Sequence, residues 1–205
     1  MKQNSSNLSV ESLDNKKNQY IYSDEQLISR FQSGDENAYI ELVNRYKDRL
    51  TNFVYYFLKD EEQTEDVVQE TFIKLYEKKH YYKKIAKFST WIYTIARNLA
   101  NTELRKKIRR KTSVFSQISK HDYDYELPSS QPEVSQEFEN DYVGKRIQKA
   151  INQLQDPFKE VIILRDMQNL SYDDISLIID VPIGTVKSRI NRARLQLQIE
   201  LKDLK

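Results

Sequence analysis

The sequence predicts an all-α protein built from two small helical domains. Only 3 Gly and 4 Pro occur among 205 residues, whereas charged residues make up 31% and hydrophobic residues 39%. This composition favours helices joined by short loops. Apolar residues recur at helical spacing through most of the chain, and no alternating strand pattern competes with them. A segment rich in Ser, Pro and acids separates the helices into two groups.

The first domain is expected over residues 22–111, after a polar tail, residues 1–21, whose composition predicts disorder. Ser23 and Gln26 have the spacing of a capping box, which would start the first helix. The turn Ser33–Asp35 would end this helix and lead into the second.

A polar break at Lys59–Gln63 ends the second helix, and a third is expected over about 64–79. After a loop over about 81–87, a fourth helix starts at Phe88 and continues into a basic block. The four helices carry enough apolar area for a compact bundle. Their core faces are expected to include Leu27, Ile28, Phe31, Leu42, Tyr46, Phe53, Val67, Val68, Phe72, Leu75, Phe88, Trp91, Ile92, Ile95 and Leu99.

The net charge of +2 is uninformative, but its distribution along the chain is not. Residues 97–111 hold seven Lys or Arg against one acid, and residues 120–141 hold seven acids against one Lys. A polyanion-binding surface followed by an acidic linker would give this pattern, and so would simple solvation of exposed residues. The linker is expected over 112–133 and the second domain over 134–205, with helices over about 136–154, 157–168, 171–179 and 183–202.

The second domain contains a helix-turn-helix pattern. Ser171 can cap a short helix, with Asp174 returning the bond, and Pro182 can open a second, basic helix after a short turn. One stripe of that helix is apolar: Val186, Ile190, Ala193 and Leu197. The opposite side is polar and would face a DNA groove: Thr185, Lys187, Ser188, Asn191 and Arg192. The alternative is an ordinary surface helix with a solvated basic face.

Two further helices of the first domain carry polar rows. Asp66, Gln69 and Glu70 share one exposed side of the third helix, where acids suit a basic partner helix. A carboxylate metal site is the alternative, but no His accompanies these acids. On the fourth helix, Arg97, Asn101 and Arg105 are spaced by four, an arrangement that can contact phosphates and base edges.

Three strings resemble the extracytoplasmic-function (group IV) sigma factors of the sigma-70 family. They are Asp66–Tyr76, Phe88–Arg105 and the helix-turn-helix run Val181–Arg194. The resemblance implies a region 2 bundle and a region 4 helix-turn-helix domain that bind core RNA polymerase, through its β′ coiled coil and β subunit, and promoter DNA. It also implies regulation by an anti-sigma factor whose identity the sequence does not give. The acidic linker either spaces the domains or is where a regulator threads.

The resemblance assigns a role to each row. Asp66, Gln69 and Glu70 would bind polymerase, and the polar face of the last long helix would read the −35 element. Melting and reading of the −10 element would fall to the fourth helix and the loop before it, whose Tyr82 either stacks on a base or packs in the core. The residues implied for the −10 element are Tyr82, Lys83, Lys84, Lys87, Arg97, Asn98, Asn101 and Arg105.

The chain departs from the family pattern at three positions. Asp180 replaces the usual turn Gly, and Asp tolerates the left-handed conformation better than most residues. Gln155 replaces a usual Pro, so Pro157 is expected to open the next helix with Asp156 as its cap. Lys84 replaces a Gly common in the loop before the fourth helix.

No catalytic constellation, cofactor motif or metal-ligand pattern is present in the sequence. There is no Cys, and the two His lie far apart. No apolar run is long enough to span a membrane, so a cytoplasmic protein without membrane insertion is expected. Two rival functions are a stand-alone helix-turn-helix regulator and an enzyme with a DNA-binding tail. The missing catalytic residues disfavour the enzyme, and the acidic and basic rows disfavour the regulator.

Overall fold

The computed structural model describes residues 22–118 and 139–204, and within these ranges every element is a helix. The all-α prediction is therefore confirmed. The predicted tail, residues 1–21, and positions 119–133 of the predicted linker lie outside the described residues.

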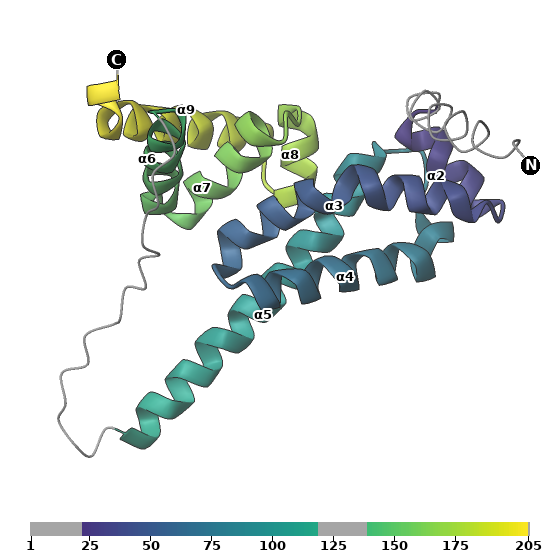
Figure 1. Cartoon of the computed structure of the whole chain (residues 1–205), viewed down its shortest axis with the longest axis horizontal. Helices are drawn as coiled ribbons and strands as arrows, with labels where there is room; N and C mark the ends of the chain where they lie inside the picture. The colour runs from purple at the N-terminus through teal and green to yellow at the C-terminus, as the bar shows by residue number, and fades with distance from the viewer. Residues whose placement is uncertain (1–21, 119–138, 205) are drawn as a thin grey trace, which may run out of the picture.

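The first domain is a bundle of helices that lie side by side (Figure 1). Its elements are α2 (Asp24–Gln32), α3 (Glu36–Leu58), α4 (Glu61–Lys78), the short 3₁₀ helix η2 (Lys79–Tyr81) and α5 (Phe88–Ile118). α3 contacts α2, α4 and α5, which makes it the central element of the bundle.

Side-chain caps set where these helices begin. Ser23 and Gln26 form the predicted capping box at the start of α2. Gly34 takes a φ of 101°, and its lack of a side chain permits the turn that ends this helix. The prediction was wrong at α4, which begins at Glu61 because the Asp60 carboxylate accepts a hydrogen bond from the Gln63 backbone N–H. The polar break therefore contains a cap and the first turn of a helix.

The structure also corrects the end of the fourth helix. α5 continues through Ile118, into the segment whose composition suggested a linker from residue 112. No Gly or Pro occurs between Lys111 and Ile118, so nothing in the backbone interrupts the helix. The second half of α5 extends away from the other helices of the bundle (Figure 1).

The second domain packs four helices and a π-helical turn around a smaller core. Its elements are α6 (Glu139–Gln153), α7 (Asp156–Ile162), the π-helix η3 (Ile163–Met167), α8 (Tyr172–Ile179), α9 (Ile183–Glu200) and a final 3₁₀ turn, η4 (Lys202–Leu204). The prediction that Asp156 caps α7 was wrong. The Gln155 carbonyl already accepts the Phe158 and Lys159 N–H groups, both at 2.9 Å, so Gln155 is the cap and Asp156 is the first helical residue.

Aromatic side chains dominate the first core and aliphatic ones the second. In the first domain Tyr46, Phe53, Phe88 and Tyr93 are almost completely buried, and their rings meet edge to face. The second core includes Ile162, Ile163, Ile175, Val186 and Ile190. The domains also touch: α5 packs against α8 as well as against α3 and α4.

Two isoleucines on α9 allow the contribution of the second core to be measured. Ile190 is fully buried, whereas Ile199 is 75% exposed on the same helix. We expect Ile190→Ala to reduce the free energy of unfolding by about 2–5 kcal/mol, because it removes packed methyl groups and leaves a cavity. Ile199→Ala should stay within about 0.5 kcal/mol of wild type. Urea unfolding followed by circular dichroism would measure both, and equal losses would mean that α9 is not packed as described.

Candidate nucleic-acid interface

The helix-turn-helix of the second domain is held by local bonds on both sides of its turn. Ser171 and Asp174 form the predicted capping box at the start of α8. Asp180 ends this helix in the left-handed conformation, with a φ of 55°, as expected for a residue in place of the turn Gly. Pro182 is the N-cap of α9, where a missing N–H costs no hydrogen bond.

α9 buries one face and exposes the other, as predicted. Val186, Ile190 and Ala193 are fully buried, and Leu197 packs against them at the edge of the core. The opposite side carries four exposed polar residues and one half-buried residue: Lys187, Ser188, Asn191 and Arg192, with Thr185. Amide, hydroxyl and guanidinium groups on one helix face can bond base edges in a major groove.

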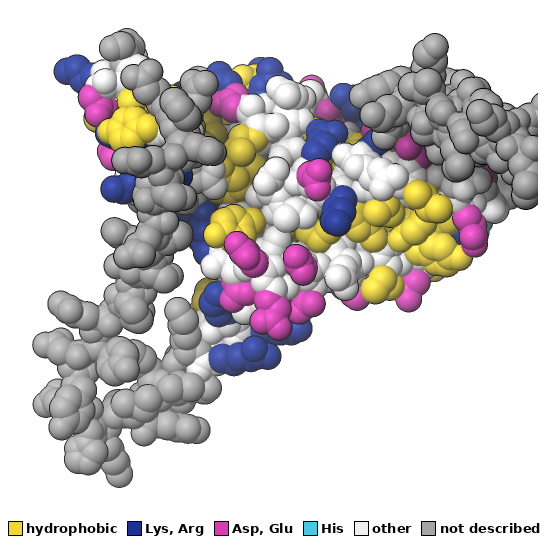
Figure 2. Space-filling view, in the orientation of Figure 1, with side chains coloured by type: hydrophobic (Ala, Val, Ile, Leu, Met, Phe, Trp, Pro, Cys, Tyr) yellow, Lys and Arg dark blue, Asp and Glu magenta, His cyan; other side chains and the backbone are white. Residues whose placement is uncertain are grey.

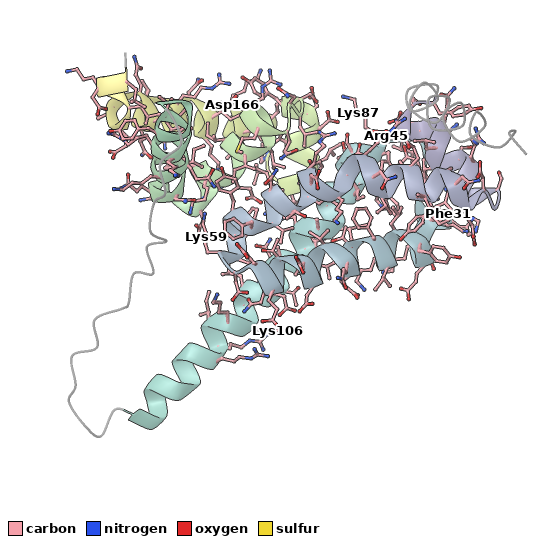
Figure 3. The ribbon with its side chains drawn as sticks, viewed as in Figure 1. Phe31, Arg45, Lys59, Lys87, Lys106 and Asp166 are labelled. Carbon is pink, nitrogen blue, oxygen red and sulfur yellow. The ribbon has the colours of Figure 1, made fainter. Side chains whose placement is uncertain are left out.

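Arg194 is not part of this polar face, nor does it extend freely into solvent. Its guanidinium donates two hydrogen bonds to the Asp166 carboxylate, at 2.5 and 3.2 Å, and this bond raises the pKa of Arg194 (Figure 3). Asp166 lies in η3, so the ion pair connects the recognition helix to the π-helical turn behind it. The contact of Arg194 therefore lies within its own domain.

The loop between η2 and α5 contains one buried aromatic residue, and its neighbours are exposed. Tyr82 is only 6% exposed; its ring packs on Trp91 and Phe88, and its hydroxyl donates to the Ala86 carbonyl oxygen. In this structure Tyr82 therefore packs in the core and is not available to stack on a base. Lys83 and Lys84 are exposed.

Two exposed side chains beside this loop were missed by the sequence analysis. Tyr81 is 77% exposed and Ile85 is 89% exposed, so each can meet a base or an apolar partner. Neighbouring tyrosines give no periodic signal that tells the buried one from the exposed one. Only the packing of Tyr82 under Trp91 distinguishes them.

The polar row of α5 does not form one solvent-facing surface. Asn98 and Arg105 are exposed and Asn101 is half-buried, but Arg97 donates from Nε to Glu160 of α7 at 2.5 Å. Lys87, just before α5, donates to Asp174 of α8 at 2.8 Å (Figure 3). Two of the residues predicted to contact DNA are thus bonded to the second domain.

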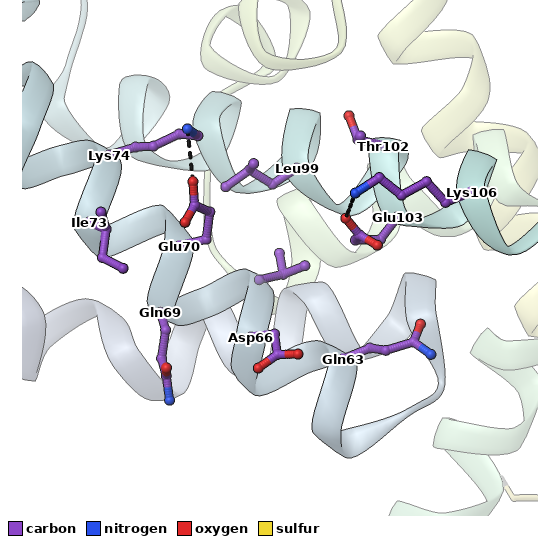
Figure 4. Close-up of a pocket in the computed structure, with 11 residues that line it drawn as sticks. Gln63, Asp66, Gln69, Glu70, Ile73, Lys74, Leu99, Thr102, Glu103 and Lys106 are labelled. Atoms are coloured by element: carbon purple, nitrogen blue, oxygen red, sulfur yellow. Dashed lines mark hydrogen bonds and ion pairs between the residues drawn. The ribbon is translucent and has the colours of Figure 1, made fainter.

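The predicted acidic row lies along a cleft between α4 and α5 (Figure 4). Asp66 and Gln69 are exposed at its edge, and Glu70 is paired with Lys74 at 2.8 Å. Across the cleft, Glu103 is paired with Lys106 at 2.6 Å on α5. Val67 and Leu99 add apolar lining. Figure 2 shows acids gathered where α4 begins, beside the cations of α5.

An apolar hollow adjoins this cleft and was not predicted. Tyr39, Ile40 and Val43 of α3 line it together with Phe72 and Ile73 of α4. Ile40 is 54% exposed and Ile73 is 50% exposed, and hydrophobic side chains are visible over these two helices in Figure 2. Gln69 borders both the hollow and the cleft, so the acidic and apolar surfaces are continuous.

In the described part of the chain, no group of three or more His, Cys, Asp or Glu side chains is arranged to hold a metal ion. None of the helices within residues 22–118 and 139–204 is long and apolar enough to cross a membrane.

Known proteins resemble both domains. The family model for Sigma-70 region 2 matches residues 42–110, and the model for Sigma-70 region 4 matches residues 144–197. The ECF RNA polymerase sigma factor SigW of Bacillus subtilis is 35% identical over 188 residues, covering 86% of this chain and 96% of that protein. The chain belongs to the ECF RNA polymerase sigma factors.

Other members of the family are similarly related to this sigma factor. The RNA polymerase sigma-H factor of Pseudomonas aeruginosa is 33% identical, covering 83% of this chain and 90% of that protein. The ECF sigma-E factor of Escherichia coli is 34% identical, with the same two coverages. Membership of this family supports a role in promoter-directed transcription initiation by RNA polymerase.

Solved structures share the fold of this sigma factor. The sigma factor RpoE of Bartonella quintana, crystallised with the anti-sigma factor NepR, gives a TM-score of 0.62 at 27% identity, covering 79% of this chain and 95% of that chain. CnrH in complex with the cytosolic domain of CnrY gives a TM-score of 0.63 at 20% identity, covering 88% and 97%. The region 2 match contains the cleft and the α5 row, and the region 4 match contains the helix-turn-helix.

Proposed function

We propose that this sigma factor docks on core RNA polymerase through α4, reads the −35 element with α9, and reads and helps to melt the −10 element with α5 and its preceding loop. The observation that carries the proposal is the exposed polar face of α9 on a helix-turn-helix whose opposite face is fixed in the core. Sequence-specific readout requires such a rigid helix with free polar side chains. By analogy with the RpoE complex, an anti-sigma factor is a further partner.

The docking surface is the acidic edge of the cleft together with the adjoining hollow. Asp66 and Gln69 are exposed, and the apolar side chains of Ile40 and Ile73 continue the surface. A basic amphipathic helix suits it, because cations would meet the carboxylates while apolar residues fill the hollow. The coiled coil of the polymerase β′ subunit is the proposed partner.

Promoter-specific transcription tests the proposal and its −35 surface together. With core polymerase and genomic DNA of the source organism, the wild-type chain should give transcripts from discrete start sites. Arg192→Ala should reduce them by a factor equivalent to about 1–3 kcal/mol, because one base-edge contact is lost. Lys202→Ala, which removes one exposed positive charge beyond α9, is the matched control.

Two results would oppose this proposal. Specific binding of the free chain to duplex DNA, without any polymerase-dependent transcript, would indicate a stand-alone regulator. Unchanged transcription by Arg192→Ala over a range of salt concentrations would show that the polar face of α9 does not read the promoter.

Polymerase binding should depend on the charge of the cleft edge. We expect Asp66→Arg combined with Glu70→Arg to weaken binding to core polymerase by several kcal/mol, because like charges would then face each other. Glu61→Arg with Glu65→Arg makes the same charge change, at the same spacing, on another side of α4. Co-purification with core polymerase distinguishes the pairs. Wild-type recovery of the cleft variant would show that polymerase docks elsewhere.

Promoter melting should depend on the exposed loop cations. We expect Lys83→Ala with Lys84→Ala to slow opening of the −10 region, because unstacking a base costs a few kcal/mol that phosphate contacts must offset. Permanganate reactivity of −10 thymines measures opening, and a pre-melted template should restore activity. Lys47→Ala with Lys202→Ala removes two exposed lysines from other elements as a control. Equal reactivity in both pairs would exclude the loop from melting.

A further inference from the structure

The loop between η2 and α5 is held at both ends by one helix, α2. Gln32, the last residue of α2, donates from Nε2 to the carbonyl oxygens of Lys79 at 2.6 Å and Tyr82 at 3.1 Å. Glu25, in the first turn of α2, accepts a hydrogen bond from the Phe88 backbone N–H at 3.2 Å. α2 packs against both η2 and α5, the elements that the loop joins (Figure 1).

The two anchoring side chains share one face of α2. Glu25 and Gln32 are seven residues apart, which places them on the same side of a helix and about 10 Å apart along its axis. Ile28 lies between them on this face and is completely buried, and both polar residues are half-buried. Apolar packing therefore fixes the direction in which the two anchors point.

Glu25 supplies a helix cap that the loop itself does not provide. Lys87 holds the N-cap position of α5, and an ammonium group has no acceptor for the free N–H groups at the start of a helix. The Glu25 carboxylate provides that acceptor from a different helix, and a negative charge at a helix N-terminus is favourable. The second end of the loop is thus attached to α2.

Gln32 holds the first end of the loop through both of its amide protons. The two carbonyl groups that it binds belong to the first residue of η2 and to the residue that follows η2. A side-chain amide can donate two hydrogen bonds from one nitrogen, whereas a carboxylate of the same shape can donate none. The anchor therefore depends on the amide nitrogen and not only on the size of the side chain.

Tyr82 ties the middle of the loop to the same support. Its ring packs on Trp91, and its hydroxyl donates to the Ala86 carbonyl oxygen at 2.9 Å. Burial raises the pKa of Tyr82, as do the nearby charges of Glu25 and Asp24, so the hydroxyl stays protonated and remains a donor at neutral pH. The base of the loop is accordingly fixed from within as well as from α2.

The tip of the loop is exposed between these anchors. Lys83 and Lys84 are exposed, and Ile85 is 89% exposed. Within the described part of the chain, neither lysine side chain forms a hydrogen bond or an ion pair. We infer that Glu25 and Gln32 are positioning residues for promoter opening, which hold this tip in place before DNA is bound. The inference rests on the proposed role of the loop at the −10 element.

Anchoring the loop favours opening for a physical reason. A free loop would lose conformational entropy at each of its residues when it engaged DNA, and this cost would add to the cost of unstacking a base. In an anchored loop the ordering takes place during folding instead. The contacts of the tip then contribute more fully to opening, although α2 itself need not touch DNA.

Isosteric variants of the full chain, assayed with core polymerase, test the role of Gln32. Gln32→Glu removes both donors, so it should slow the appearance of permanganate-reactive −10 thymines by about three- to tenfold, the effect of one or two lost hydrogen bonds. Gln26→Glu makes the same change on α2 but keeps its acceptor for the Ser23 N–H, and it should open at the wild-type rate. Opening by Gln32→Glu at the wild-type rate would refute the role of Gln32.

Two substitutions at position 25 distinguish an acceptor from a mere space-filler. Glu25→Ala removes the acceptor and should slow opening by about three- to tenfold. Glu25→Gln keeps an oxygen that can accept the Phe88 N–H, so it should remain within about twofold of wild type. Equal opening rates for the two variants would show that the bond to Phe88 does not position the loop.

Coupling to the tip separates positioning from a general loss of stability. Lys83→Ala with Lys84→Ala removes the cations that the anchors hold in place. Adding Gln32→Glu to this pair should slow opening by less than about twofold further, because sites that act through one another are not additive. Multiplication of the two separate effects would show that Gln32 acts independently of the tip, and the inference would then be wrong.

The anchors can also be measured in the free chain, since Trp91 is its only Trp. The Tyr82 ring lies 5.4 Å from the Trp91 ring between centroids, so a displaced loop would uncover the indole. Gln32→Glu should increase acrylamide quenching of Trp91 fluorescence, and Gln26→Glu should not. Glu25→Ala should speed hydrogen exchange of the Phe88 amide, measured by NMR. Unchanged quenching and exchange would mean that α2 does not hold the loop.

These measurements distinguish failure of the inference from failure of the proposed function. Slow opening by the Lys83→Ala, Lys84→Ala pair, together with wild-type opening by both anchor variants, would overturn the inference alone. Wild-type opening by the lysine pair, or no transcription by the wild-type chain, would overturn the proposed role of the loop and with it the inference.

Discussion

Tyr93 connects the two halves of this sigma factor, and much of the structure depends on how it is placed. Its ring lies in the aromatic core of the first domain, edge to face with Phe53 and Tyr46. Its hydroxyl donates to Gln168 of the second domain. Burial raises the pKa of Tyr93 to about 12, so the hydroxyl stays protonated and remains a donor at neutral pH. α5 therefore has two buried faces, one toward its own bundle and one toward α8.

The nature of the buried groups differs between these two faces of α5. Aromatic rings fill the bundle core, where separation would expose a large apolar area to water. Toward the second domain, α5 also buries hydrogen-bonding groups, the hydroxyls of Thr90 and Tyr93. At the margin of the contact between domains, Lys59 bonds Asn152, and burial with the nearby charge of Lys159 lowers its pKa to about 8 (Figure 3).

Local signals in the sequence predicted most elements and part of the candidate site. Capping boxes at Ser23 and Ser171 placed two helix starts correctly, because both partners lie within one turn. The apolar stripe of α9 identified its exposed face, because a helix packed on one side follows a single period. The predicted helix boundaries were wrong at Asp60 and Asp156, because a polar residue can belong to a loop, a helix cap or a first helical turn. The predicted end of α5 was also wrong, because composition suggested a linker although no residue breaks the helix.

The sequence by itself determined the all-α architecture and the polar face of α9, since these follow from residue type and spacing along single helices. The family was indicated by the resemblance of three strings, not by spacing. Only the tertiary structure decided that Tyr82 packs while Tyr81 is exposed, and that Ile40 and Ile73 continue the acidic cleft as an apolar hollow. It alone placed Arg97 and Lys87 against Glu160 and Asp174. Those pairs join residues more than sixty positions apart, and helical periodicity carries no information about which surfaces of two domains meet.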